Sequence, residues 1–425
     1  MENMKKEILI IKGNIVFTEE SSRFSIFEKS YIIVSDGYVE GIYKEIPKEY
    51  ENIEVQDYGD NIIIPGFVDL HVHAPQYSLC GLGYDKTLLQ WLNNYTFKEE
   101  AKFKDVSYAE KVYKDFVQDL YDNGTTRSVI FGTIHRKSTE ILMDLLNEKG
   151  LSAYVGKVNM DINSPDYLME SEEESVEETE KWIGEYKDKY KNVKPIITPR
   201  FVPSCSSKLL KELGRVAHEN NLPVQSHLSE NVSEIQWVKE LHPESKSYGH
   251  VYDMYGLFGQ TKTVMAHCIH LSEDELERIK KNEVFIAHCP NSNVNISSGI
   301  AFINRLMSEN YNVGLGSDLA GGEKISMLSN IADTIKLSKI RTMDYKDGSR
   351  PLTSSEGFYL ATKGGGKFFG KVGSFEKGYE FDALVIDDKN LWKYYDGTIE
   401  ERMEKLIYLG DSNNIVARYC FGKEI

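Results

Sequence analysis

After about residue 65 the chain alternates between short apolar runs and longer stretches in which apolar residues recur every three or four positions. Short apolar runs predict buried strands, and the longer periodicity predicts amphipathic helices. In the stretch Tyr108–Asp122, for example, Val112, Phe116 and Leu120 fall on one helix face. The predicted strands are Gly66–His71, Thr125–Phe131, Ala153–Val158, Pro195–Phe201, Pro223–His227, Thr263–His267, Val284–His288 and Val313–Asp318. The predicted helices between them include Tyr108–Asp122, Thr139–Lys149, Ser206–Glu219 and Ser272–Lys281.

Eight strands that alternate with helices over roughly 300 residues predict an α/β protein with a (β/α)8 TIM barrel. The two ends of the chain instead contain short strand-like runs, such as Ala383–Ile386 and Ile415–Phe421, and candidate turns at Gly13-Asn14, Asp36-Gly37 and Gly422. We therefore expect both ends to form one small composite β-sandwich. Its two parts would be residues 1–64 and 366–425, around a catalytic barrel at 65–365. Two unrelated edge extensions are the alternative.

The composition limits where the protein acts. The chain has 425 residues, of which 41% are hydrophobic and 27% charged, so one large core is available without disulfides. Five scattered cysteines with no Cys-x-x-Cys pair favour a reducing compartment, the cytoplasm. The apolar run Ile8–Ile11 is too short for a signal peptide or a membrane span and predicts a first strand. We therefore expect no membrane partner.

The net charge of -16 argues against nucleic acid as a partner, because phosphate binding requires a concentrated basic surface. A free nucleobase carries no phosphate, so the acidity still permits a small heterocyclic substrate. The segment Glu172–Lys191 is rich in Glu and Lys at helical spacing, which predicts a solvated helix face rather than an interaction tail.

The candidate chemistry begins with His71 and His73, at the end of the first predicted barrel strand. Side chains two apart on a strand point the same way, so both rings can reach one ion. His227 and His267 end the fifth and sixth predicted strands, and Asp318 ends the eighth. In TIM barrels the strand ends at the C-terminal face carry the chemistry, so these five side chains should converge.

The other histidines have weaker claims. His135 follows the second strand and His288 ends the seventh, and both are expected to brace the structure rather than bind metal. The remaining histidines are predicted to lie in helices or loops with solvated or capping roles: His218, His242, His250 and His270.

Three histidine nitrogens and one carboxylate leave a position for water, as a catalytic zinc site requires. Such an ion lowers the pKa of bound water toward about 7. Glu230, three residues after His227, is then a candidate proton carrier; its alternative role is to cap the helix that follows. Because His and carboxylate ligands suit several divalent ions, Fe²⁺ or another ion remains open beside Zn²⁺.

Five blocks of sequence carry a resemblance to a known family. They are Pro65–Tyr77, Pro195–Phe201, Gln225–Asn231, Ala287–Asn293 and Gly314–Gly322. In order, and over most of the chain, these blocks resemble the signature of the guanine deaminases in the amidohydrolase superfamily. One departure is Cys268, after His267, at a position where the resemblance leads us to expect the glycine of animal relatives.

The resemblance implies a barrel with a composite β-sandwich, one zinc ion per chain and a homodimer. It also implies hydrolytic deamination of guanine to xanthine and ammonia, in purine catabolism. The implied metal ligands are His71, His73, His227 and Asp318, and the implied catalytic residues are Glu230, His267 and Asp318. The implied substrate-binding residues are Gln76, Arg200 and Phe201. An amide and a guanidinium can read the lactam edge of a purine, although Arg200 could instead form a salt bridge beneath the barrel rim.

Several alternatives stay open at this point. The same scaffold could deaminate an oxidised guanine, a pterin, a triazine or an adenosine-like compound. A binuclear amide hydrolase would need a carboxylated lysine at the end of the fourth strand, where Thr198-Pro199-Arg200 stands and Lys194 lies upstream. An inactive barrel kept as a scaffold or binding protein is a further alternative. Such a protein should have lost metal ligands, whereas this sequence retains all the candidate ligands. The other zinc deaminase design is excluded, because the chain has no Pro-Cys-x-x-Cys.

Overall fold

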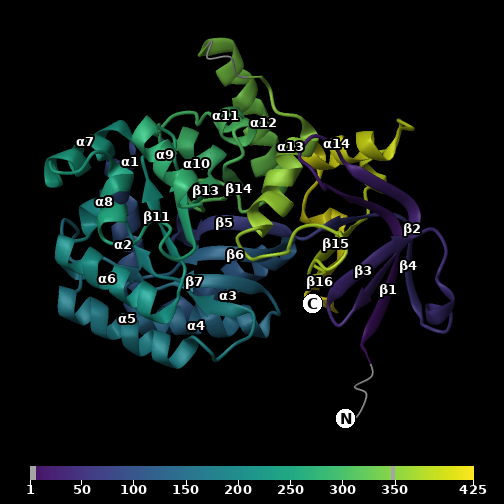
Figure 1. Cartoon of the computed structure of the whole chain (residues 1–425), viewed down its shortest axis with the longest axis horizontal. Helices are drawn as coiled ribbons and strands as arrows, with labels where there is room; N and C mark the ends of the chain where they lie inside the picture. Colours follow the sequence, from purple (N-terminus) through teal and green to yellow (C-terminus); the bar gives the residue numbers. More distant parts are fainter. Residues whose placement is uncertain (1–5, 346–349) are drawn as a thin grey trace.

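The computed structural model describes residues 6–345 and 350–425, so parts of the predicted N-terminal and barrel segments, at 1–5 and 346–349, lie outside the described residues. Eight parallel strands form two sheets of four (Figure 1). The first sheet has the order β5 (Phe67–His73), β6 (Thr125–Phe131), β7 (Ser152–Gly156) and β9 (Val193–Pro195). The second has the order β11 (Val224–Leu228), β12 (Thr263–His267), β13 (Phe285–His288) and β14 (Asn312–Leu315).

Each predicted strand is present, but two are interrupted. The third continues after β7 as the short β8 (Val158–Asn159), and the fourth continues after β9 as β10 (Thr198–Pro199). β8 and β10 pair with each other in parallel. The eighth strand ends at Leu315, so Asp318 lies in the following loop rather than on the strand.

Backbone and side-chain contacts connect the two parallel sheets. Ile197 and Val224 form a parallel bridge between the β9–β10 segment and β11. At the other end, the Asp318 amide donates to the His71 carbonyl at 2.8 Å. Apolar side chains from both sheets, with Ile196 just after β9, share one buried cluster: Val68, Leu70, Val129, Ile196, Val264, Phe285 and Ala287.

The four helices predicted by name are all present, within three residues at each end. They are α3 (Val106–Asp122), α4 (Arg136–Glu148), α6 (Ser207–Asn220) and α9 (Glu273–Lys281). The longer helices around them are α5 (Glu172–Tyr186), α7 (Val232–Leu241), α8 (Tyr248–Met254), α12 (Met327–Asp344) and α14 (Ile399–Leu409). The shorter ones are α1 (Leu88–Trp91), α2 (Phe97–Glu100), α10 (Pro290–Asn295), α11 (Ile303–Ser308) and α13 (Ser354–Tyr359).

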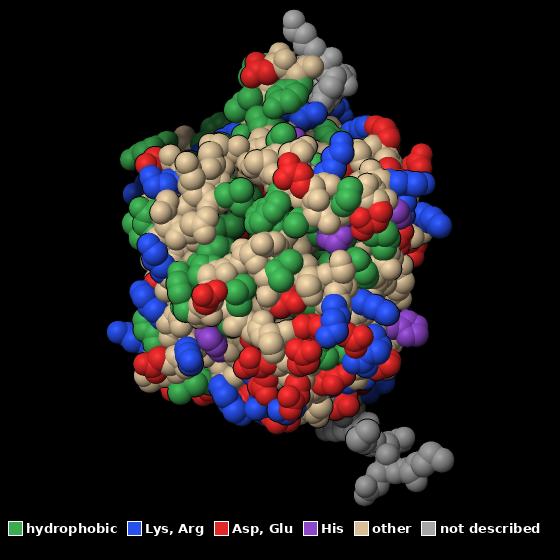
Figure 2. All heavy atoms as spheres, turned by 90° about the vertical axis from the view of Figure 1, so that its left-hand side faces the viewer, with side chains coloured by type: hydrophobic (Ala, Val, Ile, Leu, Met, Phe, Trp, Pro, Cys, Tyr) green, Lys and Arg blue, Asp and Glu red, His purple; other side chains and the backbone are tan. Residues whose placement is uncertain are grey.

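Helix α5 covers most of the Glu/Lys-rich segment and has the predicted solvated face. It ends at Tyr186, and its Trp182 side chain is fully buried. On the outer side Lys181 pairs with Glu177 at 2.7 Å. Figure 2 views the molecule from the left-hand side of Figure 1. It shows Asp, Glu, Lys and Arg side chains interspersed over the lower part of that side, at the height where Figure 1 places α5.

Strands from both chain ends form one seven-stranded sheet, in the order β17-β16-β15-β4-β1-β2-β3. The N-terminal strands are β1 (Ile8–Phe17), β2 (Ser25–Ser35), β3 (Tyr38–Tyr43) and β4 (Val55–Pro65). The C-terminal strands are β15 (Ala383–Ile386), β16 (Ile415–Cys420) and β17 (Lys423–Glu424). Figure 1 shows this sheet on one side of the molecule, with the C-terminus beside the N-terminal strands.

One predicted turn is wrong. Gly13-Asn14 lies inside β1, at a bulge where the register with β2 shifts between Gly13 and Ile15. The Asn14 side chain donates to the Asp60 carbonyl and accepts from the Lys29 amide, so its polar atoms are paired within the sheet. The Asp36-Gly37 prediction is confirmed, because both residues have positive φ (52° and 86°) between β2 and β3. Within the described ranges, no helix is both long and apolar enough to cross a membrane.

Candidate active site

The five side chains expected to converge do meet, at one end of the parallel sheets. His71 and His73 lie at the end of β5, His227 in β11, and His267 is the last residue of β12. Asp318 reaches the same place from the loop after β14. The side chains of His71, His73, His267 and Asp318 are buried, and that of His227 is nearly so.

The nitrogen and oxygen atoms of these residues face one another at short range. Asp318 Oδ1 lies 3.1 Å from His71 Nε2 and 3.4 Å from His73 Nε2. His73 Nε2 lies 3.3 Å from His227 Nε2. His267 Nε2 is 3.8 Å from Asp318 Oδ2, slightly farther from the carboxylate than the other two rings are.

Backbone and side-chain oxygens fix the orientation of two rings. His227 Nδ1 lies 2.6 Å from the Arg200 carbonyl oxygen, and His267 Nδ1 lies 2.9 Å from Asn293 Oδ1. A carbonyl oxygen only accepts, so in a neutral ring the proton sits on Nδ1. The Nε2 atoms that face the cluster then carry lone pairs, as a metal ligand requires.

Burial controls the protonation of this cluster. It lowers the pKa of His71, and it lowers the pKa values of His73 and His227 well below the ordinary value, so the three rings are neutral at pH 7. Burial alone would raise the pKa of the Asp318 carboxyl, but the neighbouring His71 and His267 rings hold it well below its usual range. The site thus offers three neutral imidazoles and one ionised carboxylate.

These donors fit a divalent cation. His71 Nε2 is buried and, apart from its 3.1 Å contact with Asp318 Oδ1, makes no hydrogen bond of regular geometry within the described residues, so a cation between these two atoms would satisfy both. The ligand atoms of His71, His73 and His227 lie within 4.8 Å of one another. The Cys289 sulfur also lies within that distance of the His71, His267 and Asp318 atoms, but burial raises the pKa of its thiol well above the usual value.

Glu230 faces this cluster and does not cap the following helix. The cap of α7 is Asn231, with Glu234 as its reciprocal partner. Glu230 Oε2 lies 3.4 Å from His267 Nε2, and Ser298 Oγ donates to Glu230 Oε1 at 3.2 Å. Burial, with the nearby Asp318 charge, raises the pKa of the Glu230 carboxyl well above its ordinary value. A carboxyl in this setting can both accept and return a proton.

The backbone is strained at three positions of the site. His267, Cys268 and Asp318 have φ of 70°, 50° and 46°, in the left-handed region that favours glycine. Such conformations cluster at functional sites because the surrounding structure holds them there. Cys268, the departure from the family pattern, therefore occupies a position whose backbone suits glycine.

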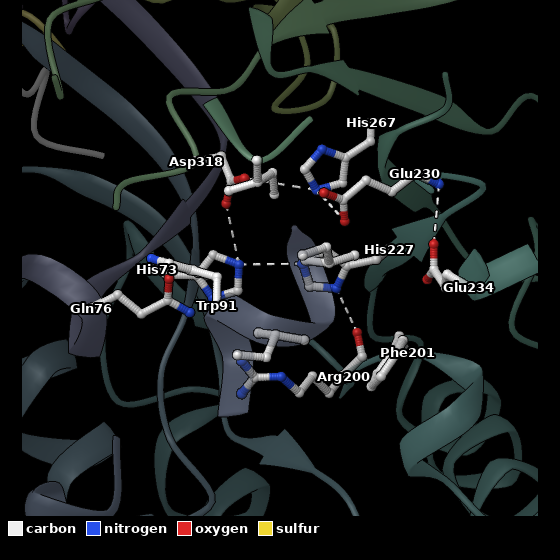
Figure 3. Close-up of a pocket in the computed structure, with 13 residues that line it drawn as sticks. His73, Gln76, Trp91, Arg200, Phe201, His227, Glu230, Glu234, His267 and Asp318 are labelled. Carbon is white, nitrogen blue, oxygen red and sulfur yellow. Dashed lines mark hydrogen bonds and ion pairs between the residues drawn. The ribbon is translucent and has the colours of Figure 1, made fainter. Parts of the chain in front are cut away.

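A pocket with about 430 Å³ of empty volume opens onto the cluster. All three predicted substrate-binding residues, Gln76, Arg200 and Phe201, line it (Figure 3). Figure 3 shows Gln76 and Arg200 across the pocket from Glu230. No sequence pattern indicated the other lining residues, which lie on short helices and turns or belong to a helix cap: Leu88, Trp91, Leu92, Glu234 and Ile296.

Arg200 lines the pocket and is also ion-paired. Its guanidinium makes a two-point contact with the buried Glu100, and Gln76 Nε2 donates to the same carboxylate at 2.9 Å. The salt bridge considered as an alternative role for Arg200 is therefore present together with the pocket position. Glu100 is a residue that the sequence did not indicate.

The residues considered less suited to metal lie elsewhere. His288 does not line the pocket, and burial lowers its pKa to about 3. His135 is half-buried, with its pKa lowered to about 4 by burial and by Lys157. Lys194 Nζ donates to the Lys187 carbonyl at 2.9 Å, away from the cluster, so it is not placed to bridge two metals.

The chain is similar to known proteins over almost its whole length. Residues 62–425 match the amidohydrolase family. The whole chain is 38% identical to the guanine deaminase of Dictyostelium discoideum, all of which is covered. It is 41% identical to the guanine deaminase of Mus musculus, with 100% of this chain and 93% of the relative covered. A crystal structure of guanine deaminase from C. acetobutylicum, with guanine bound in the active site, is 52% identical and has a TM-score of 0.97, covering 99% of this chain and 100% of that one. The chain therefore belongs to the amidohydrolase family.

Proposed function

We propose that this protein is an enzyme that deaminates guanine by hydrolysis, giving xanthine and ammonia, in purine catabolism. The observation that carries this proposal is that Gln76 and Arg200 face Glu230 and the His/Asp cluster within one pocket. The similarity to guanine deaminases, one of them solved with guanine bound, supports the choice of base.

One divalent ion, which we propose to be Zn²⁺, would be held by His71, His73, His227 and Asp318. When bound, the ion lowers the pKa of water and so supplies a nucleophile at neutral pH. The neutral rings and the ionised carboxylate support this assignment. Metal analysis of the purified protein should give one equivalent per chain, and two equivalents would favour a binuclear amide hydrolase.

The chain's own residues move the protons. Glu230 takes a proton from the attacking water and delivers it to ring N3 of guanine, which makes C2 more electrophilic. His267 and Asp318 orient the water toward C2, and the tetrahedral carbon then expels the amino group. Glu230 or Asp318 takes the proton of the new C2 hydroxyl and passes it to the amino group, which leaves as ammonia while the C2 carbonyl of xanthine forms. The 3.4 Å separation of Glu230 from His267 and the raised pKa of its carboxyl support this role.

Gln76, Arg200 and Phe201 hold the purine with C2 toward the cluster. A guanidinium donates to a carbonyl oxygen, an amide accepts from a ring N–H, and an aromatic ring packs on the base. The burial of all three side chains supports the assignment, since polar groups in a dry pocket reject analogues that leave them unpaired.

We propose that the two parallel sheets close into one (β/α)8 barrel, at residues 65–365. The bridge from Ile197 to Val224 and the bond from Asp318 to His71 support closure. Residues 1–64 and 366–425 would form the composite β-sandwich. A buried apolar cluster with members from β1, β2, β3, β4, β15 and β16 supports this division.

The decisive experiment incubates purified, metal-loaded protein with guanine and follows xanthine by absorbance and ammonia by a coupled assay. Equal amounts of xanthine and ammonia are expected. A panel of oxidised guanine, a pterin, a triazine and adenosine distinguishes other deaminases on this scaffold. If the metal-loaded sample converts no guanine, the proposal is wrong.

We also propose that the protein is a cytoplasmic homodimer. All five cysteines are unpaired, which suits a reducing compartment. Light scattering coupled to size exclusion should give twice the chain mass of 48.6 kDa.

A further inference from the structure

Glu100 lies behind the part of the pocket wall formed by Gln76 and Arg200. It is the last residue of α2, its side chain is 1% exposed, and it does not itself line the pocket. Its Oε1 accepts from Gln76 Nε2 at 2.9 Å and from Arg200 Nη2 at 3.0 Å, while its Oε2 accepts from Arg200 Nη1. One buried carboxylate therefore holds both side chains that face the substrate.

The bond to Glu100 fixes which way the Gln76 amide points. An ionised carboxylate only accepts hydrogen bonds, so the amide must turn its NH2 group toward Glu100. Its carbonyl oxygen, Oε1, is left with no hydrogen bond from the described residues. The Gln76 side chain is 2% exposed and lines the pocket, so this oxygen is available as an acceptor on the pocket side.

The same carboxylate fixes the Arg200 guanidinium. Two of its five N–H groups are bonded to Glu100, in the two-point geometry that is most specific for a carboxylate. The Phe97 ring lies 5.2 Å from the guanidinium carbon and limits its movement from another side. The remaining N–H groups can only donate, so the pocket wall presents donors from Arg200 beside an acceptor from Gln76.

We infer that Glu100 is a positioning residue that sets this order of donor and acceptor, and thereby selects a base with a 6-oxo group and an N1–H. The inference rests on the proposed function and names what makes the site specific for guanine. In guanine the 6-oxo group accepts and N1–H donates, which matches Arg200 and Gln76. In 2-aminopurine position 6 carries only hydrogen, and N1 accepts, so Gln76 Oε1 faces another acceptor. Both bases carry the amino group at C2, so both could lose ammonia to water.

The test measures kcat and KM for guanine and for 2-aminopurine on the metal-loaded enzyme. We expect the wild type to favour guanine in kcat/KM by at least about a hundredfold, because 2-aminopurine leaves buried polar groups unpaired. In Glu100→Gln the new NH2 group faces a donor of Gln76 or Arg200. The Gln76 side-chain amide is then no longer held in one orientation and can flip, which exchanges its donor and its acceptor. KM for guanine should rise about 10- to 100-fold, the usual effect of losing a hydrogen bond to a charged group. The preference over 2-aminopurine should fall at least about tenfold, with a smaller change in kcat.

Glu99→Gln is the matched control. Glu99 is the neighbouring buried carboxylate on α2, but it bonds to Ser78, Lys102 and Tyr108 and does not line the pocket. The Glu99→Gln variant should keep the wild-type preference for guanine over 2-aminopurine, even if the substitution lowers its thermal midpoint. If Glu100→Gln does not fold, Glu100→Asp takes its place, because the shorter arm cannot reach both partners and the same loss of preference is expected.

The outcomes separate this inference from the proposed function. A metal-loaded wild type that converts neither base would overturn both. A wild type that converts guanine and 2-aminopurine equally, or a folded Glu100 variant with the wild-type preference, would overturn the role of Glu100 alone. Metal content should be unchanged in every variant, since Glu100 makes no bond to the proposed ligands.

Discussion

Glu230 is the residue whose replacement should separate proton transfer from metal binding. Its carboxyl faces His267 at 3.4 Å, and it is not among the proposed metal ligands. Glu230→Gln keeps the size of the side chain but cannot accept a proton from water. We expect one metal equivalent per chain and a turnover that falls about 10²–10⁴-fold, the usual contribution of a positioned acid–base group.

A suitable control is Glu140→Gln on α4, which removes a buried carboxylate paired with Arg136 and Lys137 away from the pocket. Its turnover should stay within a few fold of the wild type. Near-normal turnover in Glu230→Gln would remove the residue from the mechanism, whereas loss of metal would show that Glu230 helps to bind the ion.

His135 should make the folded protein sensitive to acid. Burial, with the positive charges of Lys157 and Lys104, lowers the pKa of His135 to about 4, below the value of 6.5 expected for the unfolded chain. Between these values the unfolded chain binds more protons, so stability is lost as pH falls from about 6.5 to about 4. His135→Gln removes this contribution. Its urea midpoint should therefore fall less between about pH 7.5 and pH 4.5 than that of the wild type.

His218→Gln is the control for that measurement. Its ring is exposed on α6, so it should keep the wild-type difference between the two midpoints. An identical acid response in His135→Gln and the wild type would mean that other groups carry the whole effect.

Sequence spacing was informative for residues at the ends of strands. His71, His73, His227 and His267 were found because a strand pattern states where each side chain must point. Glu100 was not found, because its role depends on helix α2 folding over the pocket next to Arg200. Nothing in the short segment around it distinguishes Glu100 from the adjacent Glu99, which bonds elsewhere.

At the scale of elements, the sequence predicted which strands exist better than where they end. The third and fourth predicted strands are broken at Lys157 and at Ile196–Ile197, where the chain leaves one ladder and forms the short β8–β10 pair. The hydrophobic pattern of an uninterrupted apolar run does not show where the strand changes its pairing partner. At Gly13-Asn14 the error was the reverse, because residues typical of a turn lie inside a continuous strand. They form a bulge in β1, and the Asn14 side chain bonds to Asp60 and Lys29.

Two helical glycines should respond oppositely to the same substitution. A Cβ added at Gly214 on α6 would lie 1.9 Å from the Tyr255 carbonyl oxygen, at the end of α8, whereas a Cβ at Gly184 on α5 would meet nothing within 4 Å. Alanine favours a helix over glycine by about 1 kcal/mol. At Gly184 that gain is unopposed, and Gly184→Ala should stabilise the protein by about 0.5–1 kcal/mol.

At Gly214 the backbone clash outweighs the gain, so Gly214→Ala should destabilise the protein by about 1–3 kcal/mol, as overpacking usually does. Thermal midpoints of the two variants and the wild type test the pair. Equal midpoints for both variants would mean that α6 can move away from α8 at little cost.

At the scale of the whole molecule, a buried ion pair connects the first parallel sheet to the seven-stranded sheet. Arg127 of β6 donates to both oxygens of Asp382, which precedes β15, and also pairs with Glu380 at 2.8 Å. The Asp382 side chain is fully buried and also accepts from the Phe421 amide at 2.7 Å. Three segments that are distant in sequence therefore meet at one carboxylate.

This arrangement predicts that Asp382→Asn weakens the whole fold rather than the active site alone. The substitution removes one of the two anionic partners of the buried Arg127 and leaves only Glu380, and breaking a buried pair in this way costs about 3–5 kcal/mol. Asp387→Asn, at a partly exposed carboxylate that pairs with Lys389, is the matched control and should cost less than about 1 kcal/mol. Guanidinium unfolding followed by circular dichroism and by enzyme activity should give one common, lowered midpoint for Asp382→Asn. Loss of the seven-stranded sheet before loss of activity would instead mean that the two parts unfold separately, and that the parallel sheets with the active site are stable without Asp382.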